Sequence, residues 1–384
     1  MPKDKKELSV KEIKKARGIK EDVRVLLFAR TAGRCELCNE LLIKDAVTSI
    51  DIIWGQMAHI YAFSKDGPRS NEKRSGNNDV DNLLLACPSC HVKIDKNVQV
   101  KNYSVEYLQK MKSDHEARIK LATSFKSAQK TKVLKMIANI NNETVKLCKQ
   151  DMVEALMTEK LLPYEEENEE IDFTHNFGSN DTIYWKSKSQ EINQILAKFY
   201  SDLNREKIEH VSIFGIGPMP LLMYLGSKLE NKIKTKFFQR HRDGEDWKWK
   251  KGNPMAVYEF NLIKKGTDKN KAALLLSLSG MIDRKLLPKA IGNCCIYELS
   301  LVGGPNYNFL RTENDLFNFE KSFSTCISKI KNNHPSLKHI DVFPAVPAPV
   351  AIVCGKSLNK NSDPKLRIFN SYNRNKFKYS LTIN

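Results

Sequence analysis

Four of the nine cysteines stand in two Cys-x-x-Cys pairs, Cys35 with Cys38 and Cys87 with Cys90, and 48 residues separate the pairs. Each pair can place two thiolates on one ion, and four thiolates make a closed tetrahedral zinc site. A closed site has no open position for a substrate, so we expect this zinc to be structural. The odd number of cysteines argues against a disulfide framework.

Three polar residues between and just after these pairs have the chemistry to hydrolyse a phosphodiester. His59 lies in an apolar run typical of a strand, Asn82 precedes the apolar stretch 83–86, and His91 directly follows Cys90. The reaction needs an activated water, a cation on the phosphate and help for the leaving oxygen. We therefore predict that His59 is the base, that Asn82 orients the strand or the imidazole, and that His91 binds one Mg²⁺ or Mn²⁺.

Elements that could position these residues follow from the pattern of apolar residues. Residues 21–32 predict a helix that ends at Gly33, and the apolar runs within 40–62 predict two short strands. A short helix is expected over 89–96, and Ser104 is placed to cap a longer one. A strand, loop, strand and helix pinned by zinc would bring the two histidines towards one another.

The order of His59, Asn82 and His91 between cysteine pairs resembles the HNH family, which has a ββα-metal nuclease fold. The resemblance lies in AHIYAFSKDGPRS (58–70) and DVDNLLLACPSCHVKID (79–95). It implies that His59 is the general base, Asn82 the orienting residue and His91 a ligand of the catalytic metal.

One position departs from the HNH pattern. Many relatives carry an acidic residue immediately before the first histidine, where this chain has Ala58. The metal would then take Asp79, Asp81 or water as a further ligand, or His59 itself would be a ligand. Arg69 and Arg74 in the intervening loop are candidate clamps for DNA phosphates.

The composition is that of a soluble globular protein, with 384 residues, 41% hydrophobic and 28% charged. At about 150 residues per domain, two or three domains are expected. No stretch approaches the roughly 18 apolar residues of a membrane helix, and the charged N-terminus does not resemble a secretory signal. We therefore expect a cytoplasmic protein without membrane contact.

The formal net charge of +18 favours an anionic partner such as nucleic acid. It is uneven: residues 1–120 carry 23 basic against 17 acidic residues, and residues 181–384 carry 33 against 18. A solvated, lysine-rich surface would explain the same charge.

Three regions are expected: a nuclease domain over 1–122, a helical linker over 123–180 that includes an acidic run, and an α/β domain over 181–384. An internal repeat supports the third. Residues 210–229 and 339–358 match at six positions, each copy giving a strand, a Gly/Pro turn and an apolar helix. The repeat implies two related α/β halves, whose turns would face a shared ligand crevice at the carboxyl ends of the strands.

The second half resembles the SAVED domain, a fusion of two CARF-like Rossmann units that senses cyclic nucleotides in the bacterial anti-phage systems called CBASS. The resembling stretches are HVSIFGIGPMPLLMYLG (210–226), QRHRDGEDWKWK (239–250), LSLSG (276–280) and HIDVFPAVPAPVAIVCGK (339–356). The whole chain is thus expected to be a multi-domain α/β protein, with a zinc-stapled HNH domain before a SAVED domain.

The resemblance implies an endonuclease that a cyclic di- or trinucleotide activates to degrade double-stranded DNA, as a homo-oligomeric dimer or tetramer. Phosphates need cationic or amide donors, and bases need aromatic or apolar faces. The residues expected to contact the ligand are Pro218, Met219, Gln239, Arg242, Trp247, Ser279 and Pro347. An ungated restriction-type HNH enzyme and a zinc-containing DNA-binding protein without catalysis remain as alternatives.

Overall fold

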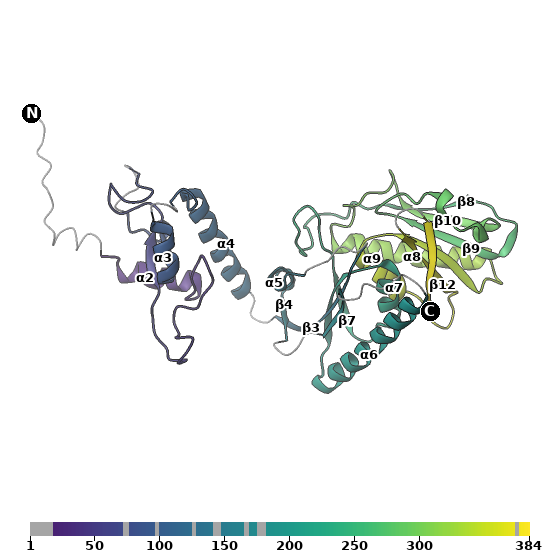
Figure 1. Cartoon of the computed structure of the whole chain (residues 1–384), viewed down its shortest axis with the longest axis horizontal. Helices are drawn as coiled ribbons and strands as arrows, with labels where there is room; N and C mark the ends of the chain where they lie inside the picture. The colour runs from purple at the N-terminus through teal and green to yellow at the C-terminus, as the bar shows by residue number, and fades with distance from the viewer. Residues whose placement is uncertain are drawn as a thin grey trace, which may run out of the picture. The chain divides into compact units, whose positions relative to one another are not determined.

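The computed structural model describes residues 18–71, 77–96, 100–124, 128–140, 147–164, 169–174, 182–372 and 376–384. The chain divides into two compact units, Met1–Lys126 and Ser127–Asn384 (Figure 1). Each unit has a hydrophobic core of its own. None of the helices in the described ranges is long and apolar enough to cross a membrane.

The N-terminal unit combines a two-stranded antiparallel sheet with three helices. Its elements are α2 (Glu21–Thr31), β1 (Gln56–His59), the 3-10 turn η1 (Val80–Asn82), β2 (Leu83–Ala86), α3 (Pro88–Asp95) and α4 (Val105–Thr123). All four side chains of β2 are buried, and they pack with Leu27 of α2 and Leu108 of α4. The helix predicted over 21–32 is confirmed. Of the two strands expected within 40–62 only β1 forms, and residues 41–51 make isolated bridges instead.

A wholly parallel, five-stranded sheet opens the C-terminal unit. Its strands are β3 (Gln129–Ala138), β4 (Leu161–Pro163), β5 (Glu169–Phe173), β6 (His210–Ile216) and β7 (Lys234–Phe238). The accompanying helices are α5 (Lys149–Thr158), α6 (Thr182–Glu206) and α7 (Met219–Lys228). β3 pairs with β4 and β5 on one edge and with β6 on the other, which makes it the centre of the sheet.

The prediction of a helical linker over 123–180 is wrong. Residues 129–138 form β3, and their buried side chains join the main core of the C-terminal unit. Glu169 and Glu170 at the end of the acidic run belong to β5, whose Ile171 and Phe173 are buried beside β3. The alternation of lysines with apolar residues in β3 fits a strand, and burial within a parallel sheet outweighed the helical propensity of this segment.

The second sheet has six strands in the order β13-β12-β11-β9-β10-β8. Its elements are β8 (Tyr258–Lys264), β9 (Asp268–Ser277), β10 (Cys294–Leu301), α8 (Glu313–Asn333), β11 (His339–Ala345), α9 (Ala348–Lys356), β12 (Lys365–Tyr372), β13 (Lys376–Ile383), and the turns η2 (Arg284–Leu286) and η3 (Lys289–Ile291). The four inner strands are parallel and the two edge strands antiparallel. The largely parallel α/β architecture expected from the sequence is therefore confirmed.

The internal repeat corresponds to one strand–helix unit in each sheet, β6–α7 and β11–α9. The two helices lie side by side (Figure 1) and approach most closely at Gly226 and Gly355. A Cβ atom on Gly226 would come within 1.9 Å of the carbonyl oxygen of Ile352, and one on Gly355 within 1.9 Å of that of Met223. Both copies thus need glycine at this position because two backbones touch there.

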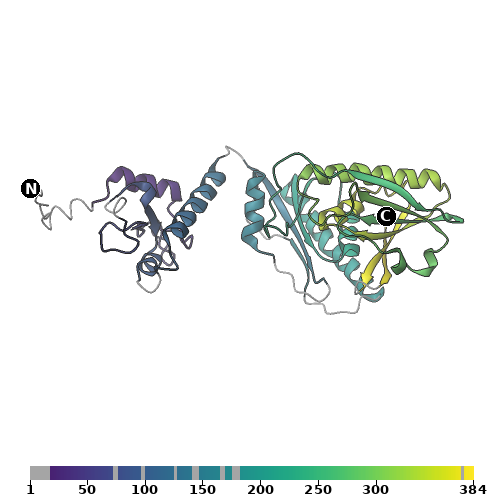
Figure 2. The ribbon, with the colours of Figure 1, turned by 90° about the horizontal axis from the view of Figure 1, so that it is seen from above.

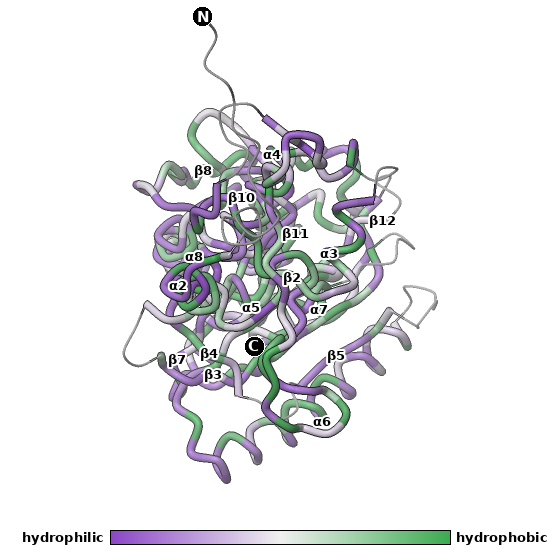
Figure 3. The backbone as a smooth tube through the Cα atoms, turned by 90° about the vertical axis from the view of Figure 1, so that its left-hand side faces the viewer, coloured by the Kyte–Doolittle hydropathy of each residue, from purple (hydrophilic) through white to green (hydrophobic). Residues whose placement is uncertain are grey.

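Helices of the C-terminal unit follow their sequence signals. Thr312 caps α8 in a capping box with Asp315, and this helix is the long yellow-green one in Figure 2. Hydrophobic and hydrophilic segments alternate along α6 in Figure 3, since only one of its faces packs on the core. Residues of both sheets share this core, so the two related halves form one domain.

Candidate functional sites

Four cysteine sulfurs converge in the N-terminal unit. The Sγ atoms of Cys35, Cys38, Cys87 and Cys90 all lie within 4.8 Å of one another, and those of Cys38 and Cys87 are 3.8 Å apart. Two sulfurs of a tetrahedral site with Zn–S bonds of about 2.3 Å are separated by about 3.8 Å. Burial and the neighbouring Cys35 raise the pKa of the Cys38 thiol to about 11, so four thiolates require a cation between them. The cluster could therefore hold a zinc ion, as predicted.

Local backbone geometry presents these sulfurs. The amide of Cys35 donates to the carbonyl of Glu40 at 2.8 Å, which closes the first knuckle. Cys87 is the N-cap of α3, and its sulfur accepts from the amide of Cys90 at 3.3 Å. Pro88 occupies the first turn of that helix, where its missing N–H costs nothing.

The imidazole of His59 is held by a neighbouring amide. Its Nε2 atom lies 2.9 Å from Oδ1 of Asn78, and its ring meets Phe63 edge-on at 5.7 Å between centroids. An amide oxygen only accepts, so this contact fits the neutral tautomer that carries its proton on Nε2 and its lone pair on Nδ1. Asn78 was not among the predicted residues. In the sequence, only its place in the pair Asn77–Asn78, shortly before the apolar stretch 83–86, could have pointed to it.

Asn82 acts on the backbone rather than on the imidazole. The side chain is buried; its Oδ1 accepts from the amide of Tyr61 at 2.8 Å, and its Nδ2 donates to the carbonyls of Tyr61 and Asn77 at 3.1 and 2.8 Å. These bonds fix the chain two residues beyond His59 and the loop that carries Asn78. Of the two roles considered for Asn82, the structure places it in that of holding the strand.

His91 lies on α3 with both ring nitrogens near oxygen atoms. Its Nδ1 is 2.7 Å from Oε1 of Gln56, and its Nε2 is 3.4 Å from Oδ2 of Asp95. His59 is the last residue of β1, and Gln56, which contacts His91, is the first. These two residues of β1 are about 10 Å apart along the strand. The structure brings both histidines to the same short strand, and no hydrogen bond or ring contact joins them within the described ranges.

The acidic residues proposed to complete the metal site lie apart from His91. Asp79 is exposed, and Asp81 pairs with Arg30 at 2.9 Å. The carboxylate beside His91 is that of Asp95, four residues further along the same helix, a spacing that puts two side chains on one face. Within the described ranges, the four cysteines are the one group of three or more potential metal ligands.

Arg69 is buried and makes internal contacts, which contradicts the prediction that it clamps a DNA phosphate. Its side chain is 4% exposed and donates to the carbonyls of Ile60 and Ile94 at 2.9 and 2.7 Å and to Asp95 at 2.9 Å. Its backbone is left-handed, with φ of 56°. The guanidinium is thus consumed by internal contacts. Arg74, the second predicted clamp, lies outside the described residues.

In the C-terminal unit, the turns that follow β9 and β11 meet at the carboxyl ends of these two parallel strands. Ser277 of β9 is the register partner of Ala345 of β11, and the carbonyl of Ala345 accepts from the amides of Leu278 and Ser279 at 3.2 and 2.8 Å. Pro347 follows as the N-cap of α9, and the repeat places Pro218 as the N-cap of α7. Pro347 and Ser279 are half-buried at this edge of the six-stranded sheet, and Pro218 is half-buried after β6 of the five-stranded sheet.

Arg242 lies at this edge together with Tyr307, an aromatic residue that was not predicted from the sequence. Its guanidinium lies 5.9 Å from the centroid of the Tyr307 ring, which is 60% exposed. The amide of Asn306 donates to the carbonyl of Leu278 at 2.8 Å and so ties Tyr307 to the turn at Ser279. The run GGPNYN (303–308) directly after β10 was the signal for such a turn.

Of the other predicted ligand contacts, Trp247 lies inside the protein, and Met219 and Gln239 are half-buried. Trp247 is 1% exposed, and its ring packs edge-on against Phe214 at 5.2 Å, so the prediction that it contacts a ligand is wrong. The Trp247 ring is buried in the core instead of offering an exposed face to a base. Met219 packs against the same core, and Gln239 is half-buried with its Nε2 donating to the carbonyl of Arg240.

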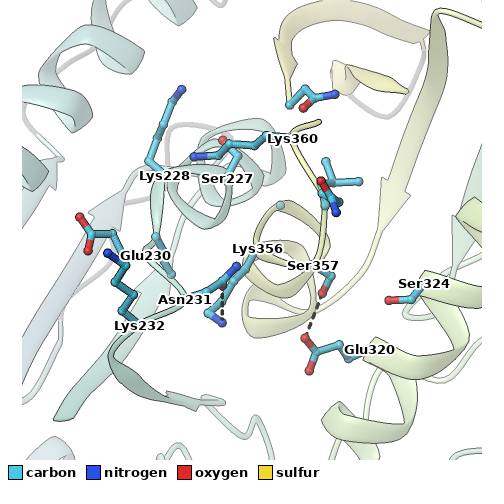
Figure 4. A pocket seen from close by; sticks show the side chains of 15 residues that line it. Ser227, Lys228, Glu230, Asn231, Lys232, Glu320, Ser324, Lys356, Ser357 and Lys360 are labelled. Atoms are coloured by element: carbon cyan, nitrogen blue, oxygen red, sulfur yellow. Dashed lines mark hydrogen bonds between the residues drawn. The ribbon is translucent and has the colours of Figure 1, made fainter. Parts of the chain in front are cut away.

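A pocket of about 770 Å³, which the sequence did not predict, opens at the opposite ends of the two repeat helices (Figure 4). Lys228 and Lys356 are the last residues of α7 and α9, and Lys232 and Lys360 follow in the next loops. Figure 4 shows these four lysines around the pocket, with Glu320 bonded to Ser357 on the far wall.

Comparison with known proteins gives relatives for the C-terminal part. No curated protein matches the chain. Among solved structures, the chain is similar to the Acinetobacter baumannii Cap4 SAVED/CARF-domain containing receptor with the cyclic trinucleotide 2'3'3'-cAAA, at 13% identity and a TM-score of 0.42, covering 74% of this chain and 56% of that chain. The structure of that receptor with 3'3'3'-cAAA gives 12% identity, a TM-score of 0.43 and the same coverage.

The Moraxella osloensis Cap4 receptor is similar at 12% identity with a TM-score of 0.37, covering 77% of this chain and 59% of that chain. The chain therefore spans little more than half the length of these receptors. The family described as the SMODS-associated and fused to various effectors sensor domain, SAVED, matches residues 192–383. These residues make up half of the chain and include both copies of the repeat, and the chain therefore belongs to the SAVED family.

Proposed function

We propose that the chain is a metal-dependent endonuclease that cuts double-stranded DNA when a cyclic oligonucleotide binds its C-terminal unit, in anti-phage defence of the CBASS type. Membership of a sensor-domain family supports the sensing half. The cluster of four cysteines, which could hold a zinc ion, and the placement of His59, Asn82 and His91 support the nuclease half.

The exposed pair of Arg242 and Tyr307 is the observation that carries the sensing half. A guanidinium binds phosphate through paired donors, and an exposed phenol ring offers a face for a base. The pair adjoins the turn at Ser279, where strands of the six-stranded sheet end. Ligands of open α/β sheets bind at this edge, so a cyclic di- or trinucleotide is the chemistry that this arrangement fits.

For the nuclease half, we assign proton transfer to His59. Asn78 holds the Nε2 proton and leaves Nδ1 with a lone pair to accept a proton from water. His91 and Asp95, whose Nε2 and Oδ2 atoms are 3.4 Å apart, would hold one Mg²⁺ or Mn²⁺. That ion would supply charge stabilisation at the scissile phosphate. Two protein ligands leave the remaining positions to phosphate and water.

Gating requires that the ligand binds the active assembly more tightly than the resting form. We propose that the active assembly is a homo-oligomer, a dimer or a tetramer, in which paired nuclease units cut both strands of a duplex. Each half of the proposal has its own test. Calorimetry with a panel of cyclic di- and trinucleotides, including 2'3'3'-cAAA and 3'3'3'-cAAA, tests binding, and plasmid cleavage in Mg²⁺ or Mn²⁺ tests the nuclease.

A zinc-containing DNA-binding protein without catalysis is the second candidate. It is favoured by Ala58, which is fully buried where many HNH proteins carry an acidic ligand, and by the hydrogen bond that occupies Nδ1 of His91. This candidate predicts DNA binding without cleavage in either metal. An ungated nuclease would instead cut DNA equally well with and without a cyclic nucleotide.

A further inference from the structure

The amino ends of the strands in the six-stranded sheet form a row of exposed lysines. These strands begin or end in the segments 263–271, 331–340 and 363–366, which contain seven lysines and two aspartates. All seven lysines are exposed. We call them the lysine edge: Lys264, Lys265, Lys269, Lys271, Lys331, Lys338 and Lys365.

Strand register aligns the members of the lysine edge. Lys365 of β12 is the partner of His339 of β11, directly after Lys338, and Ile340 is in turn the partner of Ala272, directly after Lys271. On the far side, Lys264 of β8 is paired with β10. Neighbouring strands are about 4.8 Å apart, so the four intervals from β12 to β8 extend the row over about 19 Å.

Two irregular features bring further lysines to this row. β9 pairs with Cys294 at Asp268 and with Cys295 at Ala272, so the three residues 269–271 form a bulge outside the ladder. The carbonyl of Lys269 accepts from Nδ1 of His334 at 2.8 Å, which places the end of α8, with Lys331, beside the bulge.

Few of the described carboxylates offset the positive charge of this edge. Asp341 is near enough to Lys271 to sense its charge, and it pairs with Arg367 at 3.3 Å. Asp268 pairs with Lys271 at 3.2 Å, and Asp363 accepts from the amide of Asn359. A lysine in the last turn of a helix complements the helix dipole, which accounts for Lys331. The helix dipole does not account for the lysines at the starts of strands, because no helix ends there.

The pocket of Figure 4 extends the same face. Asn384 lines the pocket and follows β13, whose Ile383 is the partner of Leu366, directly after Lys365. The four lysines around the pocket are partly balanced by Glu230 and Glu320, and Lys356 donates to Asn231 at 3.1 Å. The pocket therefore adds less charge than the lysine edge, which carries the inference.

We propose that the lysine edge binds the phosphate backbone of duplex DNA. Lysine is a point charge that neutralises phosphate without reading sequence, and a row of about 19 Å spans several phosphates. The exposed aromatic residues of the described chain, Tyr107, Tyr307, Phe317 and Tyr379, lie elsewhere, so this edge offers no platform for stacking unpaired bases. Large exposed apolar side chains that would enter a membrane are also few here.

This inference goes beyond the proposed function, because it assigns DNA contact to the sensor-family unit and needs neither cleavage nor a cyclic nucleotide. The test is binding of the full chain to a labelled 30-base-pair duplex in EDTA, measured by fluorescence anisotropy between 50 and 200 mM salt. The variant carries Lys265, Lys269, Lys338 and Lys365 changed to Gln, since these four side chains form no hydrogen bond or ion pair within the described residues.

The matched control removes four exposed lysines from other parts of the C-terminal unit, Lys186, Lys251, Lys285 and Lys376, by the same change to Gln. Removing four phosphate contacts should reduce the slope of log K against log salt by about three to four and weaken binding tenfold or more. The control should bind DNA as the wild type does. Thermal unfolding and zinc content confirm that both variants are folded.

Equal affinities for the wild type and the edge variant would overturn the inference. So would an equal loss in edge variant and control, because that loss would reflect net charge alone. Binding to anionic phosphatidylserine vesicles without binding to DNA would assign the edge to a membrane surface instead. Failure of DNA cleavage would affect the proposed function and leave this measurement intact.

Discussion

The guanidinium of Arg69 and the carboxylate of Asp95 form an ion pair of 2.9 Å that ties the loop after β1 to helix α3. Asp95 is also the carboxylate next to His91, so this pair sets the position of a candidate metal ligand. The side chain of Arg69 is nearly inaccessible, whereas that of Asp95 is 42% exposed.

Changing Arg69 to Ala should destabilise the N-terminal unit. The carbonyls of Ile60 and Ile94 would lose their donor, and buried unpaired acceptors of this kind cost about 2–3 kcal/mol in total. Urea unfolding of the variant gives the free-energy change. Arg24→Ala, at a residue whose side chain is 51% exposed, is the control and should leave stability unchanged. An equal stability for both variants would show that Arg69 is not an anchor.

Zinc binding is predicted at one ion per chain. Cys87→Ser should abolish it and unfold the N-terminal unit, because a structural zinc site supplies folding free energy directly. Cys148→Ser is the matched control, since Cys148 is exposed and lies outside the cluster. Elemental analysis and circular dichroism measure both effects. Full zinc content in the Cys87 variant would contradict the assignment.

The sequence predicted those parts of the site that depend on local spacing. The cysteine pairs sit on short turns, and β2, α3 and the cap at Ser104 follow from neighbouring residues. The partners of the two histidines could not be predicted in this way. Asn78 reaches His59 from 19 residues away and Gln56 reaches His91 from 35, so only the folded chain brings them together.

The same distinction explains the errors in the fold. The segment 129–138 carries lysines and apolar residues that suit a helix as well as a strand, and its pairing with β6, about 80 residues later, decides the outcome. Trp247 lies in a polar stretch, which suggested that its side chain is exposed. In the structure it packs in the core with Phe214 and Phe238. Both errors arose because contacts between residues far apart in the sequence cannot be inferred from local sequence patterns.

Ligand binding should depend on the exposed cation–aromatic pair. Arg242→Ala and Tyr307→Ala should each weaken binding of the cyclic nucleotide that calorimetry identifies by about tenfold or more, since a charged contact and a stacked ring each contribute roughly 1–3 kcal/mol. Arg205→Ala, at an exposed arginine on α6, should have no effect. Unchanged affinity in both site variants would move the ligand site away from this edge.

Acid should destabilise the C-terminal unit from about pH 6.5 downwards. Burial, together with the charge of Lys250, lowers the pKa of His241 below its usual 6.5, despite the opposing charges of Asp246 and Asp243. Below pH 6.5 the unfolded chain therefore takes up a proton that the folded chain does not, and stability falls as the pH falls.

His241→Asn should flatten this loss of stability between pH 6.5 and 5, measured by urea unfolding at each pH. Burial lowers the pKa of His210 as well, so part of the dependence should remain. A pH profile identical to that of the wild type would show that His241 is not involved.

The central claim, a nuclease switched on by a cyclic nucleotide, is tested most directly by plasmid cleavage in Mg²⁺ or Mn²⁺ with and without the panel of cyclic di- and trinucleotides, for the wild type, His59→Ala and Arg242→Ala. We predict that one nucleotide switches on cleavage of both strands, that His59→Ala abolishes it, and that Arg242→Ala shifts the required nucleotide concentration upwards. Cleavage that is the same with and without every nucleotide, or that persists in His59→Ala, would contradict the account.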